Sequence, residues 1–299
     1  MGSRPDPEQA LAEACTAAGL DPRGASVMYA RSNTVYRLAA SPVVVRLRYA
    51  PGPGEQASRV AASVWVTAWL AGMEFPAVRP LDFPQPVAAC GYIVTFWHLL
   101  PSPAAGLPPP DVGTLARLLR RLHNLPAPLP GLPAARPLGS AREDTQRCAW
   151  LAAAQRSWLL ARFDALEQQY ADATWSLGWG LIHGDAWTDN LIGTRDGAVL
   201  ADWDAVSHGP RELDLVPTSI RYRFGQPSSD WQRFCRAYGT DPAGLPGLPG
   251  LQAMRELRTI AAYLRAPDHL QARAEATRRI SDVMSGTQDQ PWHALNLAT

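Results

Sequence analysis

A set of prolines about a third of the way along the chain separates two parts with different sequence patterns. Pro101, Pro103 and the triplet at 108–110 follow short β-branched and aromatic runs and precede segments with helical spacing. Proline has no backbone N–H and a fixed φ, so it continues neither a central strand nor a helix interior. The 299 residues suffice for two lobes. We therefore predict an α+β fold, with a small antiparallel-sheet lobe over residues 1–98 and a larger helical lobe over residues 99–299.

The N-terminal part is predicted to form a curled sheet with one helix packed against it. Alternating runs separated by short polar turns predict strands, and apolar residues three and four apart predict helices. The predicted strands cover residues 26–30, 34–39, 43–48, 78–81 and 92–97. The predicted helices cover residues 7–19 and 55–72.

The C-terminal part is predicted to be helical, with a polar hairpin inside it. The helical segments are residues 111–124, residues 141–170 and most of the chain after residue 211. Between the first two lies an irregular stretch at 126–137. Only residues 181–204 break the helical pattern, with two short strands at 190–193 and 198–201 around a group of polar side chains.

Charge and composition limit the classes of partner. The formal net charge is +1, so no overall basic field would attract nucleic acid or an acidic membrane. The sequence has no apolar run of about 18 residues and no signal-peptide pattern, so we expect no membrane partner. The four cysteines are scattered without a CxxC pair, which is typical of free thiols in a reducing cytoplasm. We expect a cytoplasmic protein that binds a small molecule.

Six polar side chains are interleaved with strand-forming residues between positions 181 and 215. They are His183, Asp185, Asn190, Asp202, Asp204 and Asp214. Such acids could simply belong to a solvated hairpin, because Asp is common in turns. Phosphoryl transfer gives them a use, since it needs a carboxylate to position the attacking alcohol and oxygen ligands for magnesium. Asp185 suits the first role, and Asn190 is close enough in sequence to face the same metal as Asp202, with Asp204 in support.

Two segments of this region resemble a known family. HGDAWTDN, residues 183–190, and LADWD, residues 200–204, resemble the catalytic loop and the metal-binding segment of the aminoglycoside phosphotransferase family, relatives of choline kinases and protein kinases. The similarity extends through most of the chain, including residues 33–38 and 209–215. It implies a bilobal protein-kinase-like fold. It also implies an enzyme that uses ATP, or GTP, with Mg²⁺ to phosphorylate a hydroxyl of a small molecule.

The resemblance implies roles for individual residues. Asp185 stands at the catalytic Asp, Asn190 and Asp202 at the magnesium ligands, and Arg46 at a phosphate-binding cation. All 28 basic residues are arginine, whose planar fork binds phosphate oxygens bidentately. Further nucleotide contacts are implied for Ser32, Asn33, Thr34, Thr95 and Trp97. Supporting roles are implied for His183, Asp204 and Asp214, the last as a buried carboxylate that accepts backbone N–H groups of the catalytic loop.

One position departs from the family pattern. The family usually has a Glu on the helix after the third strand to pair with the phosphate-binding cation, and here Ser63 stands there. Either Glu55 substitutes, or Arg46 acts without a partner, or nucleotide affinity is weak. Two alternatives to a kinase therefore stay open. One is a weak or inactive nucleotide-binding pseudokinase, and the other is a nucleotidyl transferase on the same fold.

The motifs do not specify the acceptor. Residues 211–299 contain eleven Arg against nine Asp and Glu, which does not favour a polycationic antibiotic. A neutral or weakly charged alcohol is at least as good a candidate, and it could be a sugar, an amino alcohol, another antibiotic or a biosynthetic intermediate. Antibiotic resistance is thus one of several roles. Trp187 is a candidate wall of the substrate pocket. Arg221 is a candidate contact for an anion, although the segment 221–223 also fits a charged, solvated helix end.

Overall fold

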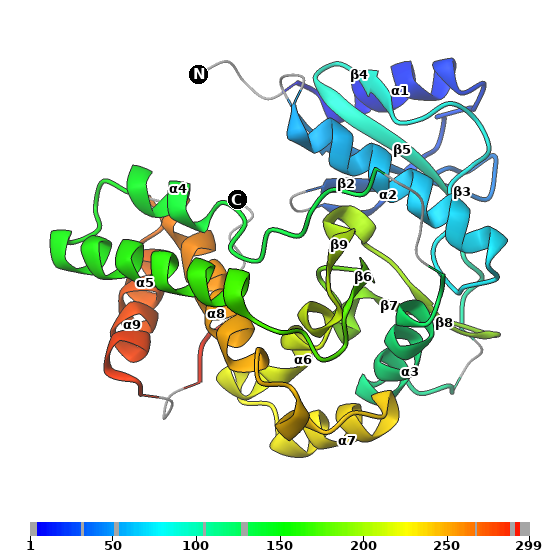
Figure 1. Ribbon diagram of the computed structural model, residues 1–299. Helices are drawn as coiled ribbons and strands as arrows, with labels where there is room; N and C mark the ends of the chain where they lie inside the picture. The colour runs from blue at the N-terminus through cyan, green and yellow to red at the C-terminus, as the bar shows by residue number, and fades with distance from the viewer. Residues whose placement is uncertain are drawn as a thin grey trace.

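The computed structural model of the chain describes residues 5–30, 33–50, 54–103, 106–126, 131–266, 268–287 and 291–293. As predicted, the fold is α+β and bilobal, with a sheet-containing lobe and a helical lobe. Figure 1 shows the sheet with α1 and α2 at the upper right and the other helices below and to the left. Among the described residues, none of the helices combines the length and the apolarity that crossing a membrane would require.

The first lobe is built on an antiparallel sheet of five strands in the order β1-β2-β3-β5-β4. The strands are β1 (Ser26–Ala30), β2 (Asn33–Arg37), β3 (Val43–Tyr49), β4 (Val87–Ala89) and β5 (Tyr92–His98). Side chains alternate along β3, so Val45 and Leu47 are buried in the sheet core while Arg46 between them points to the other face. This alternation directs the Arg46 guanidinium toward the second lobe.

The two helices of the first lobe pack into different cores. α1 (Pro7–Ala17) begins at Asp6, whose carboxylate accepts the Glu8 N–H at 2.9 Å, and its buried face joins the sheet core. α2 (Glu55–Gly72) instead places buried residues such as Leu70 in the core of the helical lobe. The helix predicted to cover the sheet therefore joins the two lobes.

The second lobe is mainly helical. Its helices are α3 (Val112–His123), α4 (Ala141–Arg147), α5 (Ala153–Asp172), α6 (Val216–Ser219), α7 (Ser228–Tyr238), α8 (Leu248–Leu264) and α9 (Leu270–Ser285). The single helical region predicted over 141–170 is two helices. The Arg156 guanidinium donates to the carbonyls of Thr145 at 2.6 Å and Cys148 at 2.5 Å, and these bonds satisfy the carbonyls that the end of α4 exposes.

Two small antiparallel pairs interrupt the helices where the polar hairpin was predicted. The β7–β8 pair (Leu191–Thr194 with Gly197–Leu200) matches the two predicted strands, with ends shifted by about one residue. The β6–β9 pair (Trp179–Ile182 with Ser207–Pro210) was not predicted, because the Ser-His-Gly-Pro sequence of β9 lacks a strand pattern. Three 3₁₀ turns complete this region, namely η1 (Thr188–Asn190), η2 (Trp203–Ala205) and η3 (Arg211–Asp214).

The strand predicted over residues 78–81 is absent from the described structure. Its place is taken by isolated bridges from Ala77 to Leu200 and from Pro80 to Trp97. Pro80 has no N–H to continue a ladder. The segment therefore connects β5 of the first lobe to β8 of the second.

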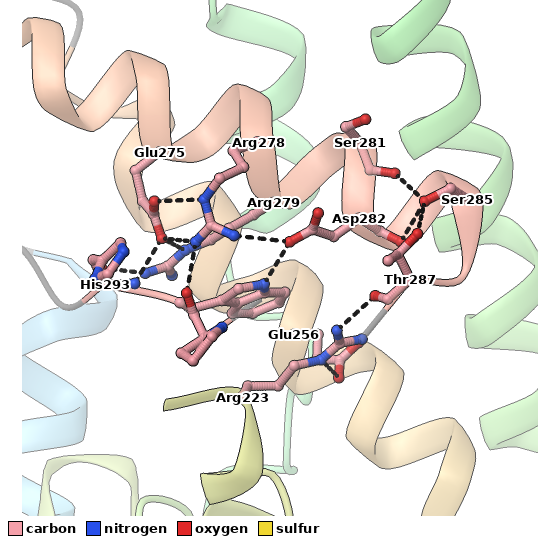
Figure 2. Close-up of polar contacts among 12 residues, drawn as sticks. Arg223, Glu256, Glu275, Arg278, Arg279, Ser281, Asp282, Ser285, Thr287 and His293 are labelled. Carbon is pink, nitrogen blue, oxygen red and sulfur yellow. Dashed lines mark hydrogen bonds and ion pairs between the residues drawn. The ribbon is translucent and has the colours of Figure 1, made fainter. Parts of the chain in front are cut away.

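Hydrogen bonds to charged side chains of α9 fix residues 291–293 against the helical lobe, as Figure 2 shows. Arg279 is fully buried, and it donates to Glu275 at 2.7 Å and to the His293 carbonyl at 2.5 Å. Its guanidinium also lies over the rings of Tyr263 and Trp292, 4.4 and 4.8 Å from their centroids. This part of the lobe is thus held by paired, buried charges.

Candidate active site

A cleft of about 890 Å³ opens between the two lobes. Its walls come from the first three strands, from the connection at residues 97–103 and from the turns around η1 and η2. Five of the residues predicted from the sequence line it, namely Asn33, Arg46, Trp97, Asn190 and Asp202. Segments that are far apart in the sequence therefore meet at one cavity.

Arg46 reaches from β3 to the acids of the other lobe. Its two Nη atoms donate to the two carboxylate oxygens of Asp204, at 2.7 and 2.5 Å, and one of them also contacts Asp202 at 3.2 Å. Arg48, on the same face of β3, also donates to Asp204. Burial lowers the pKa of Arg46, but attraction to Asp204 and Asp202 outweighs it and raises the pKa overall. The guanidinium therefore has two acidic partners.

Neither of these partners lies on α2. Ser63 is buried, and its hydroxyl donates to the Val60 carbonyl of its own helix at 2.8 Å. Glu55 pairs with Arg59 at 2.7 Å and with Arg136 at 3.0 Å. Glu55 thus does not replace the missing glutamate, and the acids at 202 and 204 neutralise Arg46 instead.

The nucleotide loop predicted between β1 and β2 is described from Asn33 onward, and Ser32 lies outside the described residues. With its amide oxygen turned toward Arg46, Asn33 accepts from Nε at 3.2 Å and from an Nη at 2.6 Å. Thr34 pairs with Leu47 in the sheet and is not part of the cleft lining. Asn33 thus helps to orient Arg46.

The loop after β6 has a backbone shape that requires glycine at one position. Gly184 has φ +79°, and a Cβ there would lie 2.2 Å from the Ala205 carbonyl oxygen. Asp214 is completely buried and accepts the N–H groups of His183 at 2.8 Å and Gly184 at 2.7 Å. These are the hydrogen bonds expected of Asp214, and His123 Nε2 adds a third contact at 3.0 Å. Buried hydrogen bonds therefore hold the loop in shape.

His183 connects the loop to the acidic segment beside it. The Asp185 N–H donates to its Nδ1 at 3.3 Å, and its Nε2 lies 2.9 Å from the Ala201 carbonyl. With Nδ1 as the acceptor, Nε2 is the nitrogen that donates to the Ala201 carbonyl. The ring also packs edge-on against Trp203, with centroids 4.7 Å apart. This geometry matches the supporting role expected of His183, which stays a prediction.

Asp185 is held by groups from two directions. Its Oδ1 accepts from Trp187 Nε1 at 2.9 Å and from Arg255 Nη2 at 2.7 Å. Burial raises the pKa of Asp185, but the guanidiniums of Arg255 and Arg258 outweigh it and lower the pKa overall. The carboxylate is therefore ionised at neutral pH, as a group that accepts a proton must be.

Asn190 and Asp202 present oxygen atoms to the cleft. Asn190 Nδ2 donates to the Asp185 carbonyl at 2.9 Å, which leaves its amide oxygen available. Asp202 has a left-handed backbone, φ 61° and ψ 61°, and its side chain is 47% exposed. Burial raises the pKa of Asp202 in spite of the attraction of Arg46. A further cation beside this carboxylate would stabilise its charged form.

The arrangement agrees with a comparison against known protein families. The model of a family described as the phosphotransferase enzyme family, APH, matches residues 29–257, which is more than half of the chain. The chain belongs to this phosphotransferase family. The resemblance predicted from the two motifs is thus confirmed. None of the curated proteins matches the sequence of this phosphotransferase.

Solved structures share its fold at low sequence identity. Amicoumacin kinase hAmiN is similar over 91% of each chain, with a TM-score of 0.71 and 13% identity. A choline/ethanolamine kinase family protein from Mesorhizobium loti is similar over 93% of this chain and 92% of its own, with a TM-score of 0.63 and 19% identity. Spectinomycin phosphotransferase APH(9)-Ia is similar over 88% of this chain and 90% of its own, with a TM-score of 0.57 and 16% identity. These similarities confirm the kinase-like fold.

Other predicted residues of this phosphotransferase lie away from the cleft lining. Thr95 is buried, and its hydroxyl accepts from Trp97 Nε1 at 2.9 Å, so it orients the indole that lines the cleft. The Trp187 ring packs under Arg255, whose guanidinium carbon is 5.0 Å from the ring centroid. Trp187 therefore supports the group that contacts Asp185, and any contact with substrate stays a prediction.

The segment 221–223 is not a solvated helix end. Arg221 Nη1 donates to the Thr188 hydroxyl at 2.7 Å and so braces η1. Arg223 is only 4% exposed and pairs with Glu256 at 2.7 Å. The charged residues of this segment predict a solvent-exposed helix end. That prediction is wrong because the sequence does not reveal that Glu256 of α8 pairs with Arg223.

Sequence reasoning missed Arg255, although it contacts Asp185 directly. The helical spacing of α8 predicts which of its residues share a face, but not which loop that face meets. A usable signal was present: Arg255 and Arg258 are one turn apart on a helix that is otherwise largely buried.

Proposed function

We propose that this phosphotransferase is a small-molecule kinase that transfers the γ-phosphoryl group of ATP, or of GTP, to a hydroxyl group. The observation that carries the proposal is that Arg46, Asn190 and Asp202 line one cleft, and that the Asn190 amide is bonded to the backbone of Asp185. Phosphoryl transfer needs these groups: a cation for the phosphates, oxygen ligands for magnesium and a carboxylate for the acceptor. The nucleotide would lie in the cleft, with Trp97 near its base.

The oxygen atoms in the cleft fit a magnesium ion. Mg²⁺ commonly takes one or two protein ligands and completes its shell with phosphate oxygens and water. The amide oxygen of Asn190 and the carboxylate of Asp202 are such ligands, and a cation would offset the burial that raises the pKa of Asp202. Bound there, Mg²⁺ would neutralise charge on the phosphates. Asp204, held by Arg46 and Arg48, would keep this segment in place.

Asp185 would receive the proton of the acceptor. As the hydroxyl oxygen bonds to the γ-phosphorus, the bond from that phosphorus to the bridging oxygen breaks, and the nucleoside diphosphate leaves with the electron pair. The hydroxyl proton passes to the Asp185 carboxylate. Because Trp187 and Arg255 both bond to Oδ1, Oδ2 is the oxygen left for the acceptor.

The similar structures support a nucleotide donor. Amicoumacin kinase was solved with AMP-PNP and Ca²⁺, and spectinomycin phosphotransferase with ADP and spectinomycin. A further structure of this fold is a microcompartment-associated aminopropanol kinase, with a TM-score of 0.60 and 16% identity. Antibiotics and small amino alcohols are thus both reasonable acceptor classes to screen.

Ser63 motivates a second candidate, a nucleotide-binding protein with little or no activity. Because no glutamate of α2 pairs with Arg46, the guanidinium is held by Asp202 and Asp204, the same segment that would hold the metal. A nucleotide would have to share Arg46 with these acids. The kinase proposal remains the better supported, because Asp185, Asn190 and Asp202 are all present and a scaffold needs none of them.

The first experiment is thermal unfolding with Mg-ATP and Mg-GTP, on the wild type, Asp202→Ala and a control, Asp164→Ala, whose side chain is 70% exposed on α5. At nucleotide concentrations near 100 times the dissociation constant, the wild type and the control should gain about 2.7 kcal/mol, and Asp202→Ala should not. Product mass then separates the candidates. A gain of one phosphate supports the kinase, a gain of one nucleotide indicates a nucleotidyl transferase, and binding without any product indicates the inactive protein.

A further inference from the structure

A second cavity lies beside the catalytic loop and shares no lining residue with the cleft proposed for the nucleotide. Its walls include Gly184 of the loop, the segment at 134–139, and residues of α2 and α8. Over the described residues, the lining contains four arginines and no Asp or Glu. They are Arg59, Arg136, Arg255 and Arg258. We call this cavity the arginine pocket.

The two arginines from α8 have donors without protein acceptors. Arg255 donates to Asp185 through Nη2 at 2.7 Å, while its Nε is buried without a hydrogen-bond partner. Arg258 makes no hydrogen bond or ion pair with any residue that the structure describes. Leaving the buried Arg255 Nε–H unsatisfied costs free energy, so this donor and the unpaired guanidinium of Arg258 are suited to a ligand.

The other two arginines have acidic partners that lie outside the pocket lining. Arg59 and Arg136 share Glu55, at 2.7 and 3.0 Å, and Arg136 also lies 3.8 Å from Glu143. The Glu55 side chain is 59% exposed, so solvent screens its charge. Of these four groups, only the two guanidiniums face the pocket.

Arg258 lies among other cations. Burial lowers its pKa, and repulsion from Arg255 and Arg59 lowers it further, while Asp185 opposes these effects. A guanidinium remains protonated at neutral pH even so. An anion in the pocket would relieve this repulsion and accept the free N–H groups, as charge-assisted hydrogen bonds to carboxylates and phosphates do.

The pocket is within reach of the proposed catalytic group. Residues three apart on a helix are neighbours, with Cβ atoms about 5–6 Å apart. An anion on Arg258 would thus lie about one helical turn from Arg255, which touches Asp185. Apolar residues such as Leu213, Val216 and Leu251 line the rest of the pocket, which at about 70 Å³ has room for a small anionic group.

We infer that the arginine pocket binds an anionic group of the acceptor, a carboxylate or a phosphate. The substrate is then a hydroxyl compound with a negative charge only a few atoms from the hydroxyl that is phosphorylated. This inference rests on the proposed kinase function and narrows its acceptor. Arg255 and Arg258 bind the anion, while Arg59 and Arg136 add attraction.

Anion binding is tested first, without any turnover. Thermal unfolding is measured with inorganic phosphate, and separately with acetate, against sodium chloride at equal ionic strength. The proteins are the wild type, Arg258→Met, Arg258→Lys and a control, Arg147→Met, which removes an exposed arginine. Each titration is repeated with saturating Mg-ADP, which displaces phosphate from the nucleotide cleft but not from the arginine pocket.

The expected result is a melting temperature that rises with phosphate or acetate in the wild type and the control, with and without Mg-ADP. Arg258→Met should lose about 10- to 100-fold in anion affinity, and Arg258→Lys should retain part of it. A response equal in the wild type and Arg258→Met, or one abolished by Mg-ADP, would overturn the inference. So would the absence of any response beyond that to chloride.

The link to the acceptor is tested by product mass in a screen of alcohols with Mg-ATP. Acceptors should carry a negative charge, and Arg258→Met should lower their kcat/KM about 10-fold or more. An efficient neutral acceptor that Arg258→Met leaves unaffected would remove the acceptor assignment. If no alcohol is phosphorylated while phosphate binding still depends on Arg258, the kinase proposal fails and the pocket stands only as an anion site.

Discussion

Two groups of arginines in this protein differ in which groups neutralise their charge. In the first, the α9 cluster of Figure 2, Arg223 pairs with Glu256 at 2.7 Å, and Arg279 pairs with Glu275 at 2.7 Å. Arg278 has carboxylate partners as well. In the second, the arginine pocket, the lining contains no carboxylate, and Arg258 has no hydrogen-bond or ion-pair partner among the described residues.

The difference separates structural charges from charges suited to a ligand. The buried ion pairs of the α9 cluster hold elements together, although Arg279 Nη1 is itself buried without a hydrogen-bond partner. Breaking such a pair leaves an uncompensated charge. A cation that faces a cavity among other cations contributes little to folding. Charges of the first kind should therefore affect stability when changed, and charges of the second kind should affect binding or turnover.

The largest expected effect is a loss of turnover when Asp185, which lies beside the arginine pocket, is changed. Asp185→Asn should lower kcat by about 10³-fold, within the usual range for a positioned general base, while nucleotide binding persists. The assay is steady-state kinetics on the first acceptor identified. Asp196→Asn, an exposed acid on the β7–β8 turn, is the control. Undiminished turnover in Asp185→Asn would remove Asp185 from the mechanism.

The next effect is on stability, at the acid of the α9 cluster. Glu275→Gln leaves Arg279 buried without its charged partner and should cost roughly 3 kcal/mol of unfolding free energy. Urea unfolding measures this. Glu167→Gln, whose side chain is 53% exposed, should cost less than about 1 kcal/mol. Equal losses in the two variants would mean that the α9 cluster contributes no more than a surface pair.

The pH dependence of the unfolding free energy tests whether the charge of Glu275 is the source of this stability. Burial raises the pKa of Glu275, but hydrogen bonds from Arg278 and Arg279 outweigh it and lower the pKa below 4.5. Glu275 therefore contributes its stability fully above pH 4.5 and loses it as the pH falls through the lowered value. The stability gap between the wild type and Glu275→Gln should narrow on acidification below pH 4.5. A gap that stays constant there would contradict the lowered pKa.

The smallest effect is expected for the stability of Arg258→Met. Arg258 forms no ion pair with the described residues, and repulsion from Arg255 and Arg59 offsets its attraction to Asp185. Its removal should therefore leave the unfolding free energy in chloride within about 1 kcal/mol of the wild type. Urea unfolding under the same conditions as for Glu275→Gln gives the comparison. A loss as large as that of Glu275→Gln would place Arg258 with the structural charges of the α9 cluster.

Much of the fold could be predicted from local patterns. The three leading strands and most helices follow from periodicity over a few residues. The failures at 78–81 and 141–170 differ in origin. Pro80 bridges to Trp97 on β5, a partner that a pattern confined to residues 78–81 does not contain. Arg156 instead donates to carbonyls at the end of α4, inside the region predicted as one helix, and periodicity does not show such a side-chain contact.

The sequence by itself determined the composition of the proposed catalytic loop and of the acidic segment. Residues 183–190 and 202–204 are short, continuous stretches, so connectivity keeps their side chains close whatever the rest of the chain does. Only the tertiary structure decided that Arg46 pairs with Asp204, that Arg255 touches Asp185, and that arginines from α2, α8 and residue 136 line one pocket. These contacts depend on how helix and sheet faces pack against one another. A net charge counted along the chain does not show which charged side chains lie close together in the folded protein.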